Sequence, residues 1–479
     1  MAALRDDNCR MRILLVCVLL TSVAYADDAT LRLTDVVRVA VRQSPELESA
    51  RLAATSAEAA QLRAEGIQDI HVGATGTVEK QSNRPLLGGG TFSISRMFST
   101  GGTFTLAVGT GRVLQIDPMT GAETTAYASS ASVLAHQPLL RGAWPSAALA
   151  PVREAEHTHS AAVLAREARA RDLIVALTIA YWRVALAAAV LDVRKASVAL
   201  AEKQLAYTQG LIKTGKAPNS ELLAVQQVLA TRKQDVLASE QAALERSLEL
   251  RQLAGLDIDA NALGVTTEPL PTVTTTSFDM PTLVQAVFDH SAELASLVEL
   301  ERAAEAGVDG ANGAARPRLD LDVAAGPVWT DTALASSFSS TPGYSVTASL
   351  TFDHAIQRRT ERGGQGIARA TRLQAKVDAR AAKRRIAASA VRAIQRARAA
   401  LEIVALAKSA TDLAQQNIEA EQKRFELGKT TNFEVLRRQD ELEGARLRYA
   451  NAIVDYLSAR AELDGLTGDV LRQHGIEIR

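Results

Sequence analysis

The sequence has only two cysteines in 479 residues, and no excess of charge of either sign. Its 54 Lys and Arg residues balance 54 Asp and Glu residues, so no global field attracts nucleic acid or an anionic surface. Both cysteines, Cys9 and Cys17, lie within the first 26 residues, which we expect to be removed. The mature chain would then have no disulfide and no cysteine metal site.

The start of the chain has the pattern of a secretory signal peptide. Arg10 and Arg12 precede the apolar run ILLVCVLL, and the sequence AYA ends at residue 26 with small residues at the two positions that a signal peptidase recognises. We expect cleavage after residues 1–26, with translation starting at Met1 or Met11. An uncleaved anchor is the alternative, but the apolar run is much shorter than the ~20 residues that span a bilayer.

The chain also lacks an uninterrupted membrane-spanning helix elsewhere. The apolar stretch 173–191 has Arg183 at its middle, and a central Arg costs about 3 kcal/mol on insertion. Turns rich in Arg and Glu continue the same helical pattern on both sides. We interpret this stretch as a buried segment of a long helix.

Signatures of enzymes are missing. GLIKTGKAPN (210–219) is close to a phosphate-binding loop, but Ala217 stands where Ser or Thr would bind magnesium, and a predicted helix precedes it instead of a strand. His157 and His159 are two residues apart on a helix, so they diverge and cannot bind one metal together. GGQGIA (363–368) is a fragment of a dinucleotide fingerprint that lacks its final glycine. We therefore expect no enzymatic activity, no cofactor and no metal.

The chain contains two copies of one plan. The segment 33–52 aligns with 280–299 at a shift of 247, and TGKAPNSELL (214–223) aligns with LGKTTNFEVL (427–436) at a shift of 213. After the Gly-Lys turn in each copy, apolar or aromatic residues recur in a stripe at a strict spacing of seven, which is typical of helices in coiled-coil contact. The stripes are Leu222, Leu229, Val236, Ala243 and Leu250 in the first copy and Val435, Leu442, Tyr449, Tyr456 and Leu463 in the second.

The predicted organisation is a signal peptide (1–26), a first repeat (27–265), a linker (266–281), a second repeat (282–468) and a C-terminal tail (469–479). In the first repeat we expect a helix over 31–68, strands within 69–142, a long helix over 146–214 and a helix over 219–255. In the second we expect a helix over 282–312, strands within 317–353, a long helix over 360–427 and a helix over 432–464. Some 68 helical residues would extend about 100 Å.

The segments between the helices have the period of strands. In YSVTASLTF (344–352) apolar residues alternate with Ser and Thr, which predicts a strand with one apolar and one hydroxyl face. The 34 extra residues of the first copy include 92–113, which resembles an additional hairpin with its bend at Gly101-Gly102. Strands of this kind suit a bilayer on one side and water on the other. A barrel must close in hydrocarbon, so several copies of the chain would have to share one.

With these features together, the sequence resembles the TolC-type outer-membrane efflux protein family over nearly all of the mature chain. The residues that carry the resemblance are SPELESARL (44–52), QPLLRG (137–142), RPRL (316–319) and the two Gly-Lys turns. The resemblance implies a mainly α fold with a transmembrane β part. In it, a long antiparallel coiled-coil barrel continues into an oligomeric β-barrel of twelve strands, with four from each copy of a trimer.

The same resemblance implies a passive exit duct in the outer membrane, with a helical tunnel across the periplasm. Its expected partners are two further copies of the chain, outer-membrane lipid, a periplasmic adaptor protein and an inner-membrane pump of the RND or ABC type. No nucleic acid is expected. The transported substrate is not predicted.

The resemblance also places candidate functional residues at the two turns and after the second one. Adaptor docking is expected at Gly215, Lys216 and Asn219 in the first copy and at Gly428, Lys429 and Asn432 in the second. From the residue pattern, the glycines end one helix and the asparagines cap the next. Glu434 matches an acidic position of the pore constriction, whereas Arg437 stands where a second acidic residue is common. An alternative for Glu434 is a favourable interaction with the helix dipole.

Two other classes remain as alternatives. A periplasmic coiled-coil adaptor shares the long helices and the signal sequence, but it has one helical hairpin and small sandwich-like β domains. A helical surface or adhesion protein does not require the duplicated turn. The β region and the duplication favour the exit duct.

Overall fold

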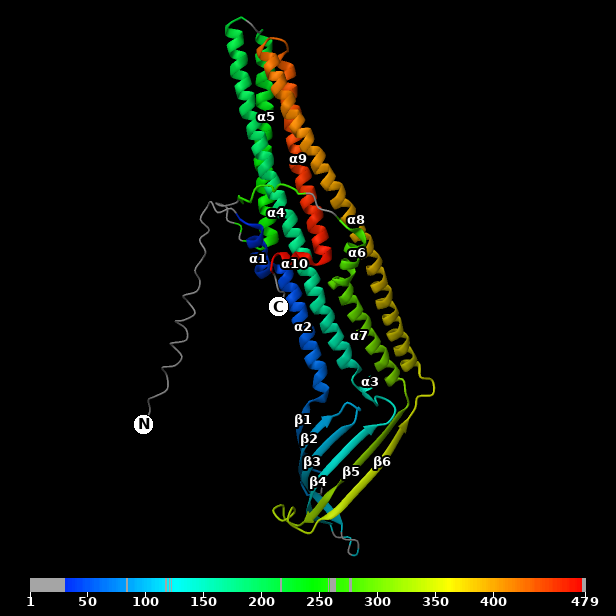
Figure 1. The fold of residues 1–479 in the computed structure, drawn as a ribbon. Coiled ribbons are helices and arrows are strands. Elements are labelled where there is room, and N and C mark those ends of the chain that lie inside the picture. Colours follow the sequence, from blue (N-terminus) through cyan, green and yellow to red (C-terminus); the bar gives the residue numbers. More distant parts are fainter. Residues whose placement is uncertain are drawn as a thin grey trace, which may run out of the picture.

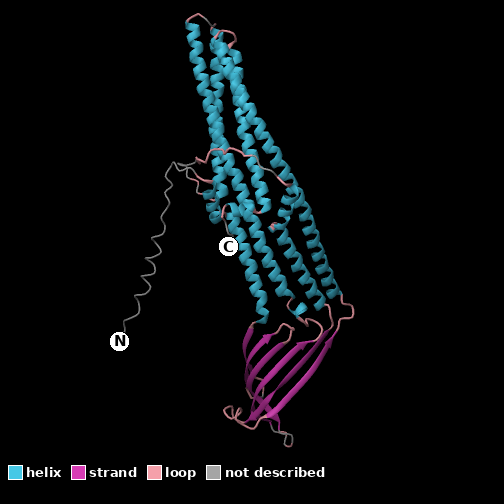
Figure 2. Cartoon of the chain, in the orientation of Figure 1, coloured by secondary structure: helices cyan, strands magenta, loops and turns pink. Residues whose placement is uncertain are grey.

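The computed structural model describes residues 31–82, 85–116, 119, 121, 123–215, 218–256, 258, 264–274 and 278–475. In these residues the chain forms an elongated helical body that continues at one end into a six-stranded sheet (Figure 1). Helices and strands occupy separate ends of the molecule (Figure 2). The expected signal peptide, residues 1–26, lies outside the described residues.

Two long helices run along the helical body. Helix α4 spans Ala150–Lys213 and α8 spans Arg359–Glu426, with 64 and 68 residues. At 1.5 Å per residue each extends about 100 Å. The shorter elements are α1 (Leu33–Gln43), α2 (Pro45–Glu65), η1 (Gly66–Gln68), α3 (Pro145–Ala148), α5 (Asn219–Ala254), α6 (Met280–Asp289), α7 (Ala292–Ala314), α9 (Asn432–Thr467) and α10 (Asp469–Gln473).

Two of the expected helices are divided. The helix expected over 31–68 breaks at Ser44, because proline at position 45 disfavours helical backbone at the residue before it, and Ser44 has φ −64° and ψ 125°. The helix expected over 282–312 breaks between α6 and α7. There the hydroxyl of Ser291 accepts a hydrogen bond from the backbone N–H of Leu294 at 3.2 Å and so caps α7.

The sheet has six antiparallel strands in sequence order, two more than the four implied by the family resemblance. The hairpin predicted over 92–113 is longer at both ends and forms β2 and β3, with Gly101 at φ +82° in its turn. The strands are β1 (Ile70–Glu79), β2 (Leu87–Met97), β3 (Thr103–Ile116), β4 (Glu123–Pro138), β5 (Arg318–Asp331) and β6 (Gly343–Asp353).

The strand register separates apolar from polar side chains. Residues paired across antiparallel strands lie on the same face, so each row of partners belongs to one face of the sheet. One apolar row crosses all six strands through Val72, Ile94, Leu106, Val133, Ala325 and Val346. A row on the opposite face has His71, Ser95, Thr105 and Thr347 on the outer strands and the apolar residues Leu134 and Ala324 on β4 and β5. The sheet therefore has an apolar face and a polar face.

The largest apolar core lies where α1, α2, α4 and α5 meet, around Leu47, Leu177 and Leu250. Tyr181 is fully buried there, and its hydroxyl donates to the carbonyl of Leu31 at 2.8 Å and accepts from the N–H of Glu268 at 3.0 Å. One α4 side chain thus fixes both the start of the described chain and the connector after α5.

Among the described helices, α4 is the one whose length and composition would also fit a membrane span. Its apolar stretch contributes Leu173, Leu177 and Tyr181 to the core, as the sequence predicts. Arg183 reaches Glu249 on α5, with 3.8 Å between Nη1 and Oε1. The stretch is a packed segment of a longer helix.

Candidate functional site

The two Gly-Lys turns lie together at the end of the helical body that is farthest from the sheet (Figure 1). Gly215 follows α4 with φ +72°, and Gly428 follows α8 with φ +69°. After α8, the N–H groups of Gly428 and Lys429 bond to the carbonyls of Phe425 and Arg424, both at 2.9 Å. This is the pattern by which a left-handed glycine ends a helix, and the N–H of Gly215 likewise bonds to the carbonyl of Ile212 at 2.9 Å, so both glycines end their helices as predicted.

The predicted caps of the following helices are wrong. Asn219 and Asn432 are already the first helical residues of α5 and α9, and the cap positions belong to Pro218 and Thr431 in extended backbone, without side-chain cap bonds. Asn219 is exposed, whereas Asn432 is buried and accepts a hydrogen bond from Gln204 on α4. The Asn432 amide therefore ties the second turn to the first long helix.

Lys429 is exposed beside Gly428, so its ammonium group is accessible to a partner. Lys216, predicted as its counterpart, lies outside the described residues.

Glu434 and Arg437 form an ion pair within the first turns of α9, with 3.2 Å between Oε2 and Nη2. The guanidinium also approaches Glu441, with 3.6 Å between Nε and Oε1. The pair is accessible, since the two side chains are 34% and 48% exposed. The charge of Glu434 is therefore balanced by Arg437, one helical turn away. Glu434 also lies in the first turn of α9, where the helix dipole favours a carboxylate.

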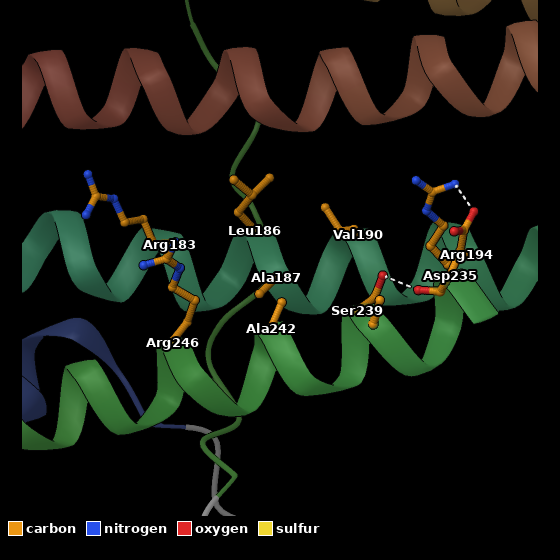
Figure 3. Close-up of a pocket in the computed structure, with 10 residues that line it drawn as sticks. Arg183, Leu186, Ala187, Val190, Arg194, Asp235, Ser239, Ala242 and Arg246 are labelled. Atoms are coloured by element: carbon orange, nitrogen blue, oxygen red, sulfur yellow. Dashed lines mark hydrogen bonds and ion pairs between the residues drawn. The ribbon is translucent and has the colours of Figure 1, made fainter. Parts of the chain in front are cut away.

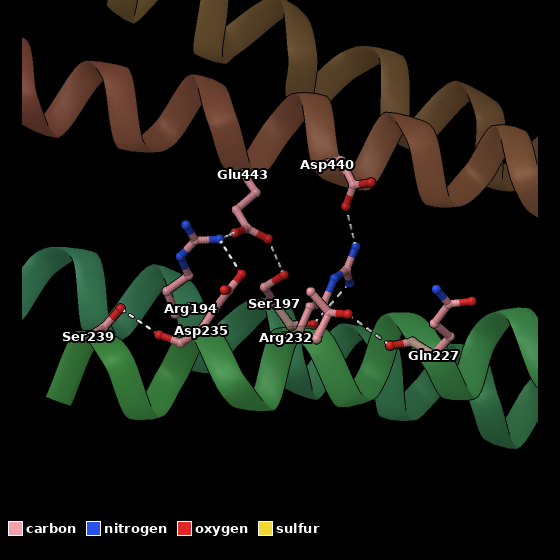
Figure 4. A network of polar contacts seen from close by, with 9 residues as sticks. Arg194, Ser197, Gln227, Arg232, Asp235, Ser239, Asp440 and Glu443 are labelled. Carbon is pink, nitrogen blue, oxygen red and sulfur yellow. Dashed lines mark hydrogen bonds and ion pairs between the residues drawn. The ribbon is translucent and has the colours of Figure 1, made fainter. Parts of the chain in front are cut away.

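A polar network below the turns joins α4 and α5 to α9 (Figure 4). Arg194 on α4 binds Asp235 on α5 at 3.1 Å and also contacts Glu443 on α9. The Glu443 carboxylate accepts a second hydrogen bond from the hydroxyl of Ser197. On α5, Arg232 is buried and reaches Ser197 and Gln439.

These network residues do not follow from the sequence, because their partners lie up to 249 positions away. The sequence does contain one indication of this network. Arg232 lies three residues after Leu229 of the first heptad stripe, so it occupies the second core position of that heptad. The corresponding position in the second copy, three residues after Leu442, is Ala445. An arginine at a coiled-coil core position indicates a buried polar contact.

A shallow groove between α4 and α5 contains three arginines (Figure 3). Each has a carboxylate partner: Arg183 and Arg246 share Glu249, at 3.8 and 2.7 Å, and Arg194 binds Asp235. Arg194 also contacts Glu443, so three carboxylates balance the three guanidinium groups.

The two histidines of α4 point to different neighbours, as their spacing predicts. Nδ1 of His157 lies 2.8 Å from Glu299 on α7, and Nδ1 of His159 lies 2.8 Å from Gln61 on α2. Both take part in contacts between helices. Within the described residues no group of three or more His, Cys, Asp or Glu side chains is arranged to hold a metal.

Comparison with known proteins agrees with this architecture. Residues 283–469 match the family model of outer membrane efflux proteins. No curated protein sequence is significantly similar to the chain.

Solved outer-membrane channels have the same fold. VceC of Vibrio cholerae is 16% identical, with a TM-score of 0.68 over 91% of this chain and 96% of its own. CmeC of Campylobacter jejuni is 14% identical, with a TM-score of 0.67 over 91% and 85%. The open state of MtrE of Neisseria gonorrhoeae is 12% identical, with a TM-score of 0.66 over 91% and 89%. The expected resemblance is thus confirmed: residues 283–469 carry an outer membrane efflux protein domain, and the chain has the fold of outer-membrane channels over nine-tenths of its length.

Proposed function

We propose that the protein is a trimeric exit duct of the outer membrane that conducts substrates passively out of the periplasm. An inner-membrane pump of the RND or ABC type would supply the energy, and a periplasmic adaptor would connect the pump to the duct. Tripartite efflux and type I secretion are both compatible with this arrangement. The chain itself would catalyse no reaction and need no cofactor.

The observation that carries the proposal is that the apolar side chains of the sheet lie on its exposed face. In β3, Phe104, Leu106 and Val108 are exposed while the intervening residues are half-buried, and β2 has the same pattern around Ile94. On β6, Val346 is 75% exposed. An apolar face of this size in water would be unusual for a monomeric soluble protein, whereas hydrocarbon would cover it favourably. Strands of 10 to 16 residues are long enough to cross the ~25 Å apolar band of a barrel.

Closure of the barrel requires more than one copy. β1 pairs only with β2 and β6 only with β5 among the described strands, so both outer strands have an unpaired edge. Unpaired backbone groups are not tolerated in hydrocarbon. Neighbouring copies would pair with these edges, and the family resemblance favours three copies.

The helical body would form the periplasmic tunnel. Helices α4 and α8 run from the sheet end of the body to the two Gly-Lys turns, and α5 and α9 return from these turns to its middle, with one such hairpin in each of the two proposed repeats (Figure 1). Helices of about 100 Å are far longer than the ~30 Å hydrocarbon core, so they would extend from the membrane into the periplasm.

The turns would form the adaptor-docking surface, with Gly215, Lys216 and Asn219 at one and Gly428 and Lys429 at the other. Nothing lies within 4 Å of a Cβ added at Gly215 or Gly428, so the main effect of substitution would be on the left-handed backbone conformation. Gly215→Val and Gly428→Val should impair docking or opening while the barrel stays inserted. Gly→Asn variants are the controls, because asparagine tolerates left-handed backbone. Normal export by both valine variants would contradict this role.

Asn432 would act differently from its expected counterpart, Asn219. Its buried contact with Gln204 suggests that it holds the two turns together rather than meeting the adaptor. The adjacent pair of Glu434 and Arg437 would line the periplasmic entrance with little net charge.

The adaptor alternative fits less well. The described strands form one open sheet, and two long hairpins reach the turns, whereas an adaptor has small sandwich domains and one hairpin. Electrophoresis and planar-bilayer recording distinguish these functions. We expect a heat- and detergent-resistant band near three times the mass of one chain and ion-conducting pores from the extracted protein. A soluble monomer without pore activity would overturn the proposal.

A further inference from the structure

We propose that the hairpin of β2 and β3 belongs to the membrane-spanning wall, so that three copies close an eighteen-stranded barrel in place of the twelve strands implied by the family resemblance. The inference rests on the proposed function, because it takes a membrane-inserted trimer as its starting point. It adds the number of strands and the width of the outer-membrane passage.

The hairpin is integrated into the sheet by continuous pairing on both sides. β2 pairs with β1 from Ile70–Arg96 to Glu79–Leu87, and β3 pairs with β4 from Thr103–His136 to Ile116–Glu123. The hairpin therefore separates β1 from β4 along their whole length. It cannot leave the wall as a flap without exposing two further unpaired edges.

The side chains of the hairpin have the polarity required of a membrane wall. Phe92, Ile94, Phe104, Leu106 and Val108 lie on the apolar face that the hairpin shares with the other strands, and all are exposed. A hairpin that stayed in water would have no reason to display five large apolar side chains on one face.

The polar face is the hollow side of the sheet, as expected of a water-filled lumen. A shallow hollow there has a mixed lining: Thr103 and Thr105 of the hairpin, Leu134, His136, Asp322 and Ala324 of the central strands, and Thr347 and Ser349 of β6. Because hairpin and edge-strand residues share this hollow, β3 curves together with the rest of the wall.

The turn of the hairpin is held at the helical end of the sheet. Thr100 accepts a hydrogen bond through its carbonyl from the N–H of Trp144 at 3.2 Å, and another from the side-chain amide of Gln137 at 3.3 Å. A Cβ at Gly101 would lie 2.3 Å from the carbonyl oxygen of Gly142. The hairpin turn therefore packs against the connection from β4 to α3, level with the helical ends of the other strands.

The two free edges are complementary to each other, which makes a second copy of this chain their occupant. β1 has 10 residues and β6 has 11, and both are exposed throughout. With six antiparallel strands, β1 and β6 run in opposite directions, so β1 of one copy can pair antiparallel with β6 of the next. Aligning Ile70 with Phe352 at the helical end places apolar residues on the same face in both strands.

Three copies of six strands give eighteen strands. With strands ~4.8 Å apart and tilted by ~40°, the barrel diameter between backbones is about 36 Å, compared with about 24 Å for twelve strands. The outer-membrane passage would be about one and a half times as wide.

Lipid quenching tests the position of the hairpin. Single cysteines replace Leu106 and Thr105 in the hairpin, and Leu350 and Ser349 in β6, after Cys9 and Cys17 have been changed to Ala. Each cysteine carries a bimane label, and the trimer is reconstituted in brominated phosphatidylcholine. We expect the labels in Leu106→Cys and Leu350→Cys to lose fluorescence to the same extent, and those in Thr105→Cys and Ser349→Cys to remain bright.

The two β6 positions separate this inference from the proposed function. Quenching at Leu350→Cys without quenching at Leu106→Cys would show a membrane-inserted sheet whose hairpin lies outside the wall, and would overturn the inference alone. Absence of quenching at Leu350→Cys would overturn the proposed function as well.

Cross-linking counts the copies in the barrel. In the alignment above, Thr75 of one copy faces Thr347 of the next, so the double variant Thr75→Cys/Thr347→Cys should form disulfides between chains on oxidation. We expect dimeric and trimeric products and none larger, while each single variant gives no trimer. A ladder that ended at the dimer would give twelve strands and would contradict the eighteen-stranded barrel.

Discussion

The side chain of Arg232 is 5% exposed, whereas that of Asp440, whose Oδ1 lies 2.7 Å from Nη2 of Arg232, is 65% exposed. The same guanidinium donates through Nη1 to the carbonyl of Ser197 at 3.1 Å and to Oε1 of Gln439 at 3.2 Å. Arginine is thus the buried member of the pair, and water can replace it at the carboxylate. The buried partners Ser197 and Gln439 have no such replacement, so the two ends of the pair contribute unequally.

This asymmetry predicts different costs for the two substitutions. Arg232→Met should lower the free energy of unfolding by about 2 kcal/mol, because it leaves buried acceptors without their charged donor. Asp440→Asn should cost less than about 1 kcal/mol, as expected of an exposed ion pair. Thermal unfolding of the purified variants, followed by circular dichroism, measures both. Equal losses would mean that the ion pair with Asp440, and not the buried contacts, is the main contribution.

The capping bond of α7 provides a second prediction. Ser291→Ala should cost about 1 kcal/mol, because its hydroxyl accepts the Leu294 N–H. Ser44 is the aligned residue at the start of α2 but makes no side-chain cap bond, so Ser44→Ala should cost less. Hydrogen exchange at the Leu294 amide should become faster in the Ser291 variant and stay unchanged in the Ser44 variant. Unchanged protection of Leu294 in both would contradict the cap.

A third prediction concerns pH and Asp464 on α9. Burial raises the pKa of the Asp464 carboxyl, although Gln473 and Arg460 oppose this shift. The folded protein then retains a proton that the unfolded chain has already released. Stability should therefore fall as pH rises from the unfolded-state pKa of ~3.9 through the raised value, and stay level above it.

Asp464→Asn should remove that part of the pH dependence. Urea unfolding between pH 3.5 and 7, compared with the unsubstituted protein, measures the difference. A decline of the same size in the Asn variant would show that another group is responsible.

The ion pair after the second turn provides a fourth prediction. If Glu434 lines the entrance, Arg437→Ala leaves its carboxylate without its partner at 3.2 Å, and the pore should become more selective for cations. Arg437→Lys keeps the positive charge and should leave selectivity nearly unchanged. Reversal potentials in a salt gradient across a planar bilayer provide the measurement. Equal reversal potentials for the Ala and Lys variants would exclude this pair from the conducting path.

Local sequence patterns anticipated the parts of the structure that depend on neighbouring residues. The alternation of YSVTASLTF corresponds to β6, and the bend placed at Gly101-Gly102 is the turn between β2 and β3. The glycines at 215 and 428 end their helices with positive φ. Each of these features is set within a few residues by side-chain periodicity or by the freedom of glycine to adopt left-handed backbone.

The same reasoning failed where a distant element decided the outcome. Asn432 was expected to cap α9, but the cap falls one residue earlier and the amide binds Gln204 on α4 instead. The expected helix over 282–312 is divided, and its cap at Ser291 was not predicted although the residue lies within the aligned segment 280–299.

The sequence by itself determined the two long helices, the amphipathic strands and the paired turns, because side-chain periodicity and local backbone sterics depend only on residues close together in the chain. Tertiary structure alone decided that all six strands share one register, so that the additional hairpin carries its apolar side chains onto the common face. It also decided that Arg232 at a heptad core position finds acceptors on α4 and α9. Register and buried polar contacts join segments separated by up to hundreds of residues, and their energy depends on which surfaces meet in space.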